Sequence, residues 1–286
     1  MKYVKRVLSI VFAVMLVLSV DGTGTNAASI DPDAPTVITL HAGSTMYGHA
    51  AGFFNENEMI HYYKFTLGTT SLYPDTMAVY LTVPTGCNYQ MQIVDMNSGQ
   101  TYEGFGKGGT SDKVIKIPKP RTTSTYLLQV FSEDGFYDTS LSGMYSISID
   151  NLYKKGTYTG KFNPTKLTNP GQATLTPVYS GTATVDLRRN TTIPDTAEVT
   201  DVEVSGTLSY NIGNTWLEID NSVSGSHNEA RLNKGYDTSF PGLSDSYEPV
   251  KAVWSIDYYT YAGKSTTFSN PQITIDYRYD QYEDFS

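Results

Sequence analysis

The feature that most constrains this chain is an alternation of apolar and polar residues that recurs along most of its length. Met77, Val79 and Leu81 share one phase of this pattern. The same pattern returns in the ranges 89–93, 126–130, 145–149, 183–187, 202–204, 250–258 and 273–279. Successive side chains of a strand point to opposite faces, so a period of two indicates strands with one buried face. The sequence therefore predicts an all-β protein built from sandwich or jelly-roll domains.

The alternation fades in one internal segment, which suggests a division into two tandem β-sandwich domains. Residues 151–178 combine Lys154, Gly156 and three prolines with few alternating apolar positions. Such a composition is typical of a linker, and the alternative is that it also holds a short edge strand. We therefore expect a first domain over 28–150, a linker over 151–178 and a second domain over 179–286.

The N-terminus has the three parts of a cleavable signal peptide. Basic residues (Lys2, Lys5 and Arg6) precede an apolar run over 7–20, and small residues stand at Thr25 and Ala27. The run is shorter than the roughly 20 residues that a membrane-spanning helix needs. Residues 1–27 are thus predicted to be removed, and we expect a secreted protein without a permanent membrane anchor.

Charge and cysteine content narrow the partners and the source. The net charge of −9 argues against nucleic acid, because acidic chains repel phosphate backbones. The single cysteine, Cys87, excludes an internal disulfide and favours a bacterial exported protein. Cys87 itself is interpreted as a small buried apolar residue.

Residues 36–150 resemble the bacterial pre-peptidase C-terminal domain, a small jelly-roll sandwich appended to secreted proteases and related to collagen-binding modules. The resemblance rests on an acidic turn at 56–58 before the aromatic strand 62–67, a hairpin around 97–99, and closing strands at 125–130 and 143–149. It implies a binding or accessory role beside an enzyme. In the second domain, Thr192-Ile193-Pro194-Asp195 before a Val-rich strand is faintly similar to the P-domains of secreted proteases.

The same resemblance implies a calcium site, since related modules bind calcium between an acidic linker and the acidic turn. The matching positions here are Asp31, Asp33 and Glu58. However, His61 stands where the family usually has Asp, and neutral imidazole is a poor calcium ligand. The alternative is that these three acids are simply solvated.

Catalytic signatures are missing from the sequence. It contains neither an H-E-x-x-H zinc motif nor a G-x-S-x-G nucleophile elbow. The carboxylates are scattered over predicted strand exteriors and turns. We therefore expect a protein that is not an enzyme.

Tyrosines are the other candidate functional groups, because Tyr presents a flat apolar ring with a polar tip. Tyr259 and Tyr261 fall in the strand phase opposite Trp254 and Tyr258, and Tyr279 lies near the C-terminus. These three are the predicted binding residues. The alternative is that they only cover the faces of the sandwich.

Three functions remain open from the sequence. The leading one is a secreted, non-catalytic binding or accessory protein that recognises an extracellular polysaccharide, a protein, a surface or an exported enzyme. The second is a small secreted hydrolase that uses carboxylates among Asp201, Glu203, Asp220 and Glu229. The third is a matrix component that self-associates through strand edges.

Overall fold

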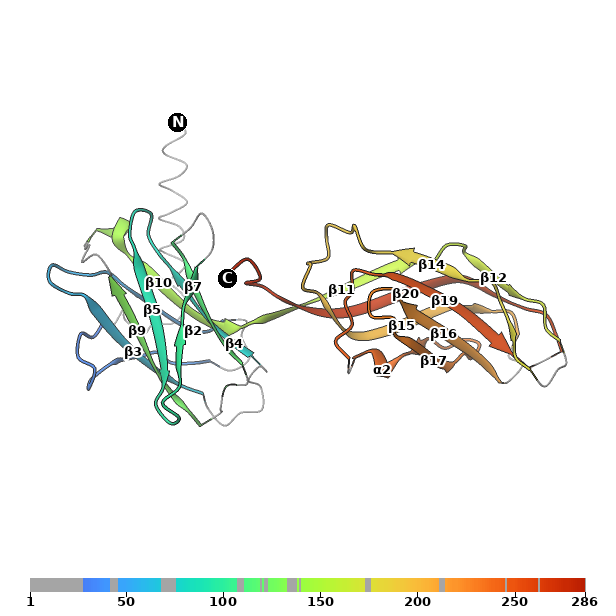
Figure 1. The fold of residues 1–286 in the computed structure, drawn as a ribbon, viewed down its shortest axis with the longest axis horizontal. Coiled ribbons are helices and arrows are strands. Elements are labelled where there is room, and N and C mark those ends of the chain that lie inside the picture. Colours follow the sequence, from blue (N-terminus) through green and yellow to red (C-terminus); the bar gives the residue numbers. More distant parts are fainter. Residues whose placement is uncertain are drawn as a thin grey trace, which may run out of the picture. The chain divides into compact units, whose positions relative to one another are not determined.

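The computed structural model describes residues 28–41, 46–67, 76–106, 111–118, 120, 123–132, 138, 140–172, 176–210, 214–244, 246–261 and 263–285. The predicted signal peptide lies outside these residues. The chain divides into two compact units, Met1–Leu152 with Asp284–Ser286, and Tyr153–Glu283. Both units are built from strands (Figure 1), and the all-β prediction is confirmed. Among the described residues, no helix has the length and apolar character needed to cross a bilayer.

The first unit holds two five-stranded sheets. One sheet runs β1 (Thr36–Val37), β3 (Ile60–Thr66), β9 (Thr125–Ser132), β5 (Tyr89–Asp95) and β6 (Thr101–Glu103). The other runs β2 (Met46–Gly52), β10 (Tyr145–Asn151), β4 (Thr76–Thr82), β8 (Lys113–Pro118) and β7 (Phe105–Gly106). A single 3-10 turn, η1 (Leu141–Gly143), precedes β10 among the described elements.

The core of the first unit lies between these sheets and follows the predicted alternation. In β5 every second residue is buried, beginning with Tyr89, and β9 alternates in the same way around Leu128. Both strands contribute to one apolar cluster with Val79 of β4 and Ile147 of β10. Cys87 is buried in this cluster as a free thiol, as the sequence predicts.

The second unit also holds two sheets. The first runs β11 (Tyr153–Lys161), β20 (Thr266–Asp280), β15 (Glu198–Leu208) and β18 (Thr238–Ser239), with β12 (Lys166–Asn169) also paired to β20. The second runs β13 (Val178–Tyr179), β19 (Val253–Thr260), β16 (Thr215–Asn221) and β17 (His227–Arg231), with β14 (Ala183–Asp186) also paired to β19. The short helix α2 (Pro241–Ser244) follows β18.

One face of β19 forms the centre of the second core. Trp254, Ile256 and Tyr258 are fully buried, and the indole Nε1–H of Trp254 donates to the Val250 carbonyl at 3.0 Å. Facing side chains come from the other sheet, among them Val202 and Ile275. The burial of alternate residues in β19 leaves Ser255, Asp257 and Tyr259 in the opposite phase.

The segment predicted as a linker, 151–178, belongs to the second sandwich from Tyr153 onward, as far as its described residues show. It contains β11, which pairs with β20 over nine residues from Tyr153↔Asp280 to Lys161↔Gln272. It also contains β12, which pairs with a different stretch of β20. The segment lacks apolar alternation because β11 is an edge strand that pairs with β20 alone among the described strands, so its side chains stay exposed or half-buried.

Candidate functional site

The three predicted calcium ligands are not brought together. Asp31 Oδ1 accepts a hydrogen bond from the backbone N–H of Asp33 at 2.9 Å, whereas Glu58 is hydrogen-bonded within a separate turn that begins at Asn55. Glu58 Oε2 accepts from the backbone N–H and the side-chain amide of Asn55, at 2.8 and 2.9 Å. Among the described residues, no three His, Cys, Asp or Glu side chains lie close enough to hold one metal ion.

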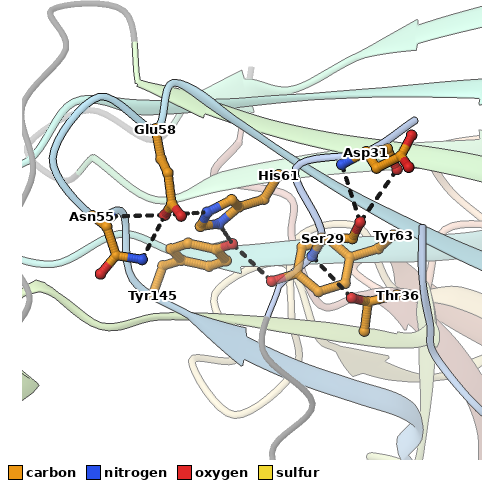
Figure 2. A network of polar contacts seen from close by, with 8 residues as sticks. All are labelled: Ser29, Asp31, Thr36, Asn55, Glu58, His61, Tyr63 and Tyr145. Carbon is orange, nitrogen blue, oxygen red and sulfur yellow. Dashed lines mark hydrogen bonds and ion pairs between the residues drawn. The ribbon is translucent and has the colours of Figure 1, made fainter. Parts of the chain in front are cut away.

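Glu58 instead belongs to a chain of polar groups that runs into the first core (Figure 2). Its Oε2 lies 3.2 Å from His61 Nε2, and His61 Nδ1 lies 2.6 Å from the Tyr145 hydroxyl. The Tyr145 hydroxyl in turn lies 2.7 Å from that of Tyr63. His61 and Tyr63 come from β3 and Tyr145 from β10, so this chain joins the two sheets.

The protons in this chain can be placed from its chemistry. Glu58 accepts, so neutral His61 carries its hydrogen on Nε2, and Nδ1 accepts from the Tyr145 hydroxyl. Tyr63 then donates to the Tyr145 oxygen. Burial lowers the pKa of His61 although Glu58 raises it, and burial raises the pKa of Tyr63 to about 12. The buried part of the network, His61, Tyr145 and Tyr63, is therefore neutral, and the negative charge stays on Glu58. Partial burial raises the pKa of Glu58, but the hydrogen bonds from Asn55 and His61 together lower it below its ordinary value.

Burial makes this network structural. His61 is 1 % exposed and stacks on Phe54 with ring centroids 4.2 Å apart. Gly52 leaves the necessary space, because a Cβ there would lie 2.7 Å from the Tyr145 hydroxyl oxygen. His61, Tyr63 and Tyr145 therefore act inside the core, as a polar link between the two sheets.

The second unit presents polar and aromatic groups on the outward side of the sheet that contains β19. Figure 1 shows β16, β17 and β19 side by side, and their register is continuous. We call this surface the outer face. It comprises Ser255, Asp257 and Tyr259 of β19, Trp216, Glu218 and Asp220 of β16, His227, Glu229 and Arg231 of β17, and the adjoining Tyr179 and Tyr261.

The pairing register sorts the outer face into rows across the strands. Tyr179, Tyr259 and Trp216 are successive partners, and we call them the aromatic row. Asp257, Glu218 and Glu229 are likewise partners across β19, β16 and β17, and we call them the acid row. Neighbouring strands lie roughly 4.8 Å apart, and same-face residues of one strand lie roughly 6.8 Å apart. The two rows therefore run in parallel, one residue pair apart.

The aromatic rings form a contiguous cluster. The Tyr259 ring lies 5.3 Å from that of Tyr179 and 5.9 Å from that of Tyr261, centroid to centroid. Tyr179 is 48 % exposed and Tyr261 41 % exposed, whereas Tyr259 is nearly covered. The Tyr259 hydroxyl donates to Glu229 Oε2 at 3.0 Å, which fixes its ring across the sheet. The cluster thus offers exposed rings on an anchored central one.

The acid row is electrostatically crowded. Burial, followed by the charge of Asp257, raises the pKa of Glu218. Burial likewise raises the pKa of Asp257, with a further contribution from Asp220. His227 stands beside the row, with its Nδ1 2.8 Å from Asp220 Oδ1 and its Nε2 3.9 Å from Glu218 Oε1. The hydrogen bond to Asp220 raises the pKa of His227.

Two of the three predicted binding tyrosines, Tyr259 and Tyr261, meet on the outer face. Tyr279 belongs instead to β20 in the other sheet of this unit, where it packs against the core beside Tyr277. The acids considered for a hydrolase are also divided. Asp201 and Glu203 lie on β15 of one sheet, whereas Asp220 and Glu229 lie on the outer face of the other.

The sequence analysis missed Trp216, Glu218 and Asp257. Their signal was present, because Trp216, Glu218 and Asp220 alternate with the buried Leu217 and Ile219. What the sequence lacked was the register that sets β16 against β19.

No family model matches the chain. The uncharacterized protein YbdN of Bacillus subtilis strain 168 is 32% identical over 167 residues, which cover 57% of this chain and 56% of that protein. The chain therefore spans just over half the length of this relative.

Solved structures with similar arrangements are distant. A protein from Eubacterium rectale is 14% identical with a TM-score of 0.34, covering 82% of this chain and 74% of its own. The pre-peptidase C-terminal domain of collagenase from Bacillus anthracis is 14% identical with a TM-score of 0.30, covering 46% of this chain and 100% of its own. These TM-scores decide neither fold nor function for this chain.

Proposed function

We propose that this protein is an exported, non-catalytic binding protein that recognises an extracellular polymer through the outer face of its second unit. The observation that carries the proposal is the tyrosine cluster in which the exposed rings of Tyr179 and Tyr261 flank the anchored ring of Tyr259. Exposed rings on a paired sheet are pre-positioned, so little side-chain freedom is lost when a ligand packs on them. The signal peptide predicted over residues 1–27 supports export.

The arrangement of carboxylates supports binding in preference to hydrolysis. Carboxylate-based hydrolysis needs a protonated acid and an ionised partner placed on either side of a scissile bond. Glu218 and Asp257 are instead direct partners in one row of a sheet surface. That geometry suits contact along an extended ligand.

Retention on insoluble polymers tests the proposal. The full chain without its signal peptide is incubated with cell wall, cellulose, xylan, chitin and collagen, and the bound fraction is measured. We expect retention on at least one polymer and its loss in the double variant Tyr179→Ala/Tyr261→Ala.

The matched control is Tyr236→Ala, which removes a tyrosine that is 75% exposed in the same unit but outside the cluster. This control should bind as the unmodified chain does. Absence of retention on every polymer, or equal retention by the double variant, would overturn the proposal.

A further inference from the structure

The outer face favours one class of polymer over others, an inference that rests on the proposed function. Its two parallel rows differ in chemistry, since one offers rings and the other offers carboxylates. A ligand that contacts both rows must carry a flat apolar surface and, about one residue pair away, groups that suit negative charge. Each requirement can be examined separately.

The charge requirement follows from the crowding of the acid row. Asp257 Oδ1 is buried and accepts no hydrogen bond from the described residues. A side-chain contact with Glu218 lowers the pKa of Asp257, in the way that a hydrogen bond does. Two carboxyl groups can share a hydrogen bond only while one of the two is protonated. When both are ionised, neither Asp257 nor Glu218 can donate to the other, and two negative charges stand side by side in the sheet. A cationic donor placed over the row would hydrogen-bond to its accessible carboxylate oxygens and offset the charge of the pair.

The protein's own cations satisfy this need only in part. His227 is 55 % exposed and binds Asp220, at the margin of the acid row. Arg231 pairs with Trp216 and so belongs to the line of the aromatic row. Anionic polymers would meet net repulsion here, and neutral hydroxyls would donate without offsetting charge. An ammonium group satisfies both needs at once.

The aromatic row selects the scaffold that bears the ammonium groups. The rings of Tyr179 and Tyr259 lie 5.3 Å apart and are tilted by 45°, and with Trp216 they form a line of ring surfaces in which Tyr179 is well exposed and Tyr259 is nearly covered. A chain of sugar rings can lie on such a line through their C–H faces, and a nearby ammonium gains a cation–π contribution. A flexible lysine side chain would contact one ring and leave the others unused.

We propose that the polymer is a glycan with free amino groups, whose sugar rings lie on the aromatic row and whose ammonium groups lie over Asp257, Glu218 and Glu229. The glycan then runs across β19, β16 and β17, perpendicular to the strands. N-acetylation would remove both the charge and most of the donor capacity of the amino group.

Calorimetric titration with soluble oligomers tests this ligand class. The probes are glucosamine oligomers, N-acetylglucosamine oligomers of the same length, and poly-lysine, each added to the full chain without its signal peptide. We expect glucosamine oligomers to bind at least about tenfold more tightly than the acetylated ones, the effect of one partly desolvated charge pair. Poly-lysine should bind more weakly, per positive charge, than the glucosamine oligomers.

Matched variants locate the preference. Glu218→Gln/Asp257→Asn should lose the preference for the free amine while retaining residual ring-dependent binding. The control Asp201→Asn/Glu203→Gln removes two carboxylates from the other sheet of the same unit and should keep the preference. Far-UV circular dichroism confirms that both variants are folded.

The remaining outcomes separate the two proposals. Equal binding of free and acetylated oligomers would overturn the amino-glycan inference and leave the binding function standing. Tighter binding of poly-lysine, unaffected by Tyr179→Ala/Tyr261→Ala, would point to a basic protein and overturn the inference. An equal loss in the control variant would assign the effect to overall charge and also overturn it. Failure of every polymer, soluble or insoluble, would remove the proposed function as well.

Discussion

The two units place their polar aromatic side chains in opposite environments. The first unit buries it, since His61, Tyr63 and Tyr145 join its sheets from inside the core. The second unit displays it, since Tyr179, Tyr259 and Trp216 lie on an outward sheet face. Both use the same strand alternation, so composition alone does not separate a scaffold from a binding surface. The decisive variable is the phase in which the tyrosines fall.

The largest expected effect comes from truncating a tyrosine in each place. Tyr145→Ala should destabilise the first unit by about 3–5 kcal/mol, because it leaves a core cavity and removes the partner of His61. Tyr261→Ala should change the stability of the second unit by less than about 0.5 kcal/mol. Hydrogen exchange of backbone amides, read separately for each unit, measures both. Similar costs for the two substitutions would break the comparison.

Removing only the hydroxyl of Tyr145 tests the buried network of the first unit more closely. Tyr145→Phe keeps the ring but leaves His61 Nδ1 and the Tyr63 hydroxyl without their buried partner. We expect a loss of about 1–3 kcal/mol in the free energy of unfolding of the first unit. Polymer binding by the second unit should not change. A neutral effect on stability would show that water replaces the lost hydroxyl.

A substitution at Gly52, beside the network, should have a smaller effect on stability that a second substitution partly relieves. Gly52→Ala places a Cβ 2.7 Å from the Tyr145 hydroxyl oxygen. This crowding should lower the free energy of unfolding of the first unit by about 1–2 kcal/mol. The Tyr145→Phe background removes the closest of these contacts, while the Tyr145 Cζ and the Tyr63 hydroxyl remain 2.9 Å from the added Cβ, so the cost of Gly52→Ala should shrink in part. Thermal unfolding of the four chains of this double-mutant cycle gives the coupling. Strict additivity would contradict the proposed contact.

The smallest effect concerns the acid row and has a defined pH dependence. The pKa of Asp257 is raised in the folded chain, so the folded state holds that proton more tightly than the unfolded state. The cost of ionised Asp257 is absent well below its ordinary pKa of 3.8 and fully present above the raised value. Asp257→Asn should therefore stabilise the second unit at pH 7 by a few tenths to about 1 kcal/mol.

That stabilisation should vanish at about pH 3, where the carboxyl is protonated in both states. Chemical denaturation of the unmodified chain and the variant at both pH values measures the difference. Destabilisation by Asp257→Asn at pH 7 would mean that the carboxylate has a donor which the present geometry does not provide.

The sequence predicted the strands better than their partners. The phases of 89–93, 126–130 and 250–258 were correct because each of these strands has one side in a core, and burial imposes alternation. The sequence allowed only a short edge strand in 151–178, whereas β11 is an edge strand of nine residues that keeps its side chains half-buried or exposed.

The candidate site depends on register, which local sequence does not encode. Tyr259 and Tyr261 were recognisable from their phase, but Tyr179 reaches them because β13 pairs with β19 about eighty residues later in the chain. Tyr279 does not join them, since its strand, β20, belongs to the other sheet. The calcium ligands were chosen by resemblance, and Glu58 is instead occupied by Asn55 and His61.

The placement of the tryptophans gives the molecule two built-in optical reporters. The chain has two tryptophans, Trp216 and Trp254, and both belong to the second unit. Trp254 is sealed in the core, so its emission reports loss of packing, whereas Trp216 stands in the aromatic row, so its emission reports contact with a ligand. Indole fluorescence therefore reports on the second unit alone. It can distinguish ligand binding from unfolding of that unit without any added label.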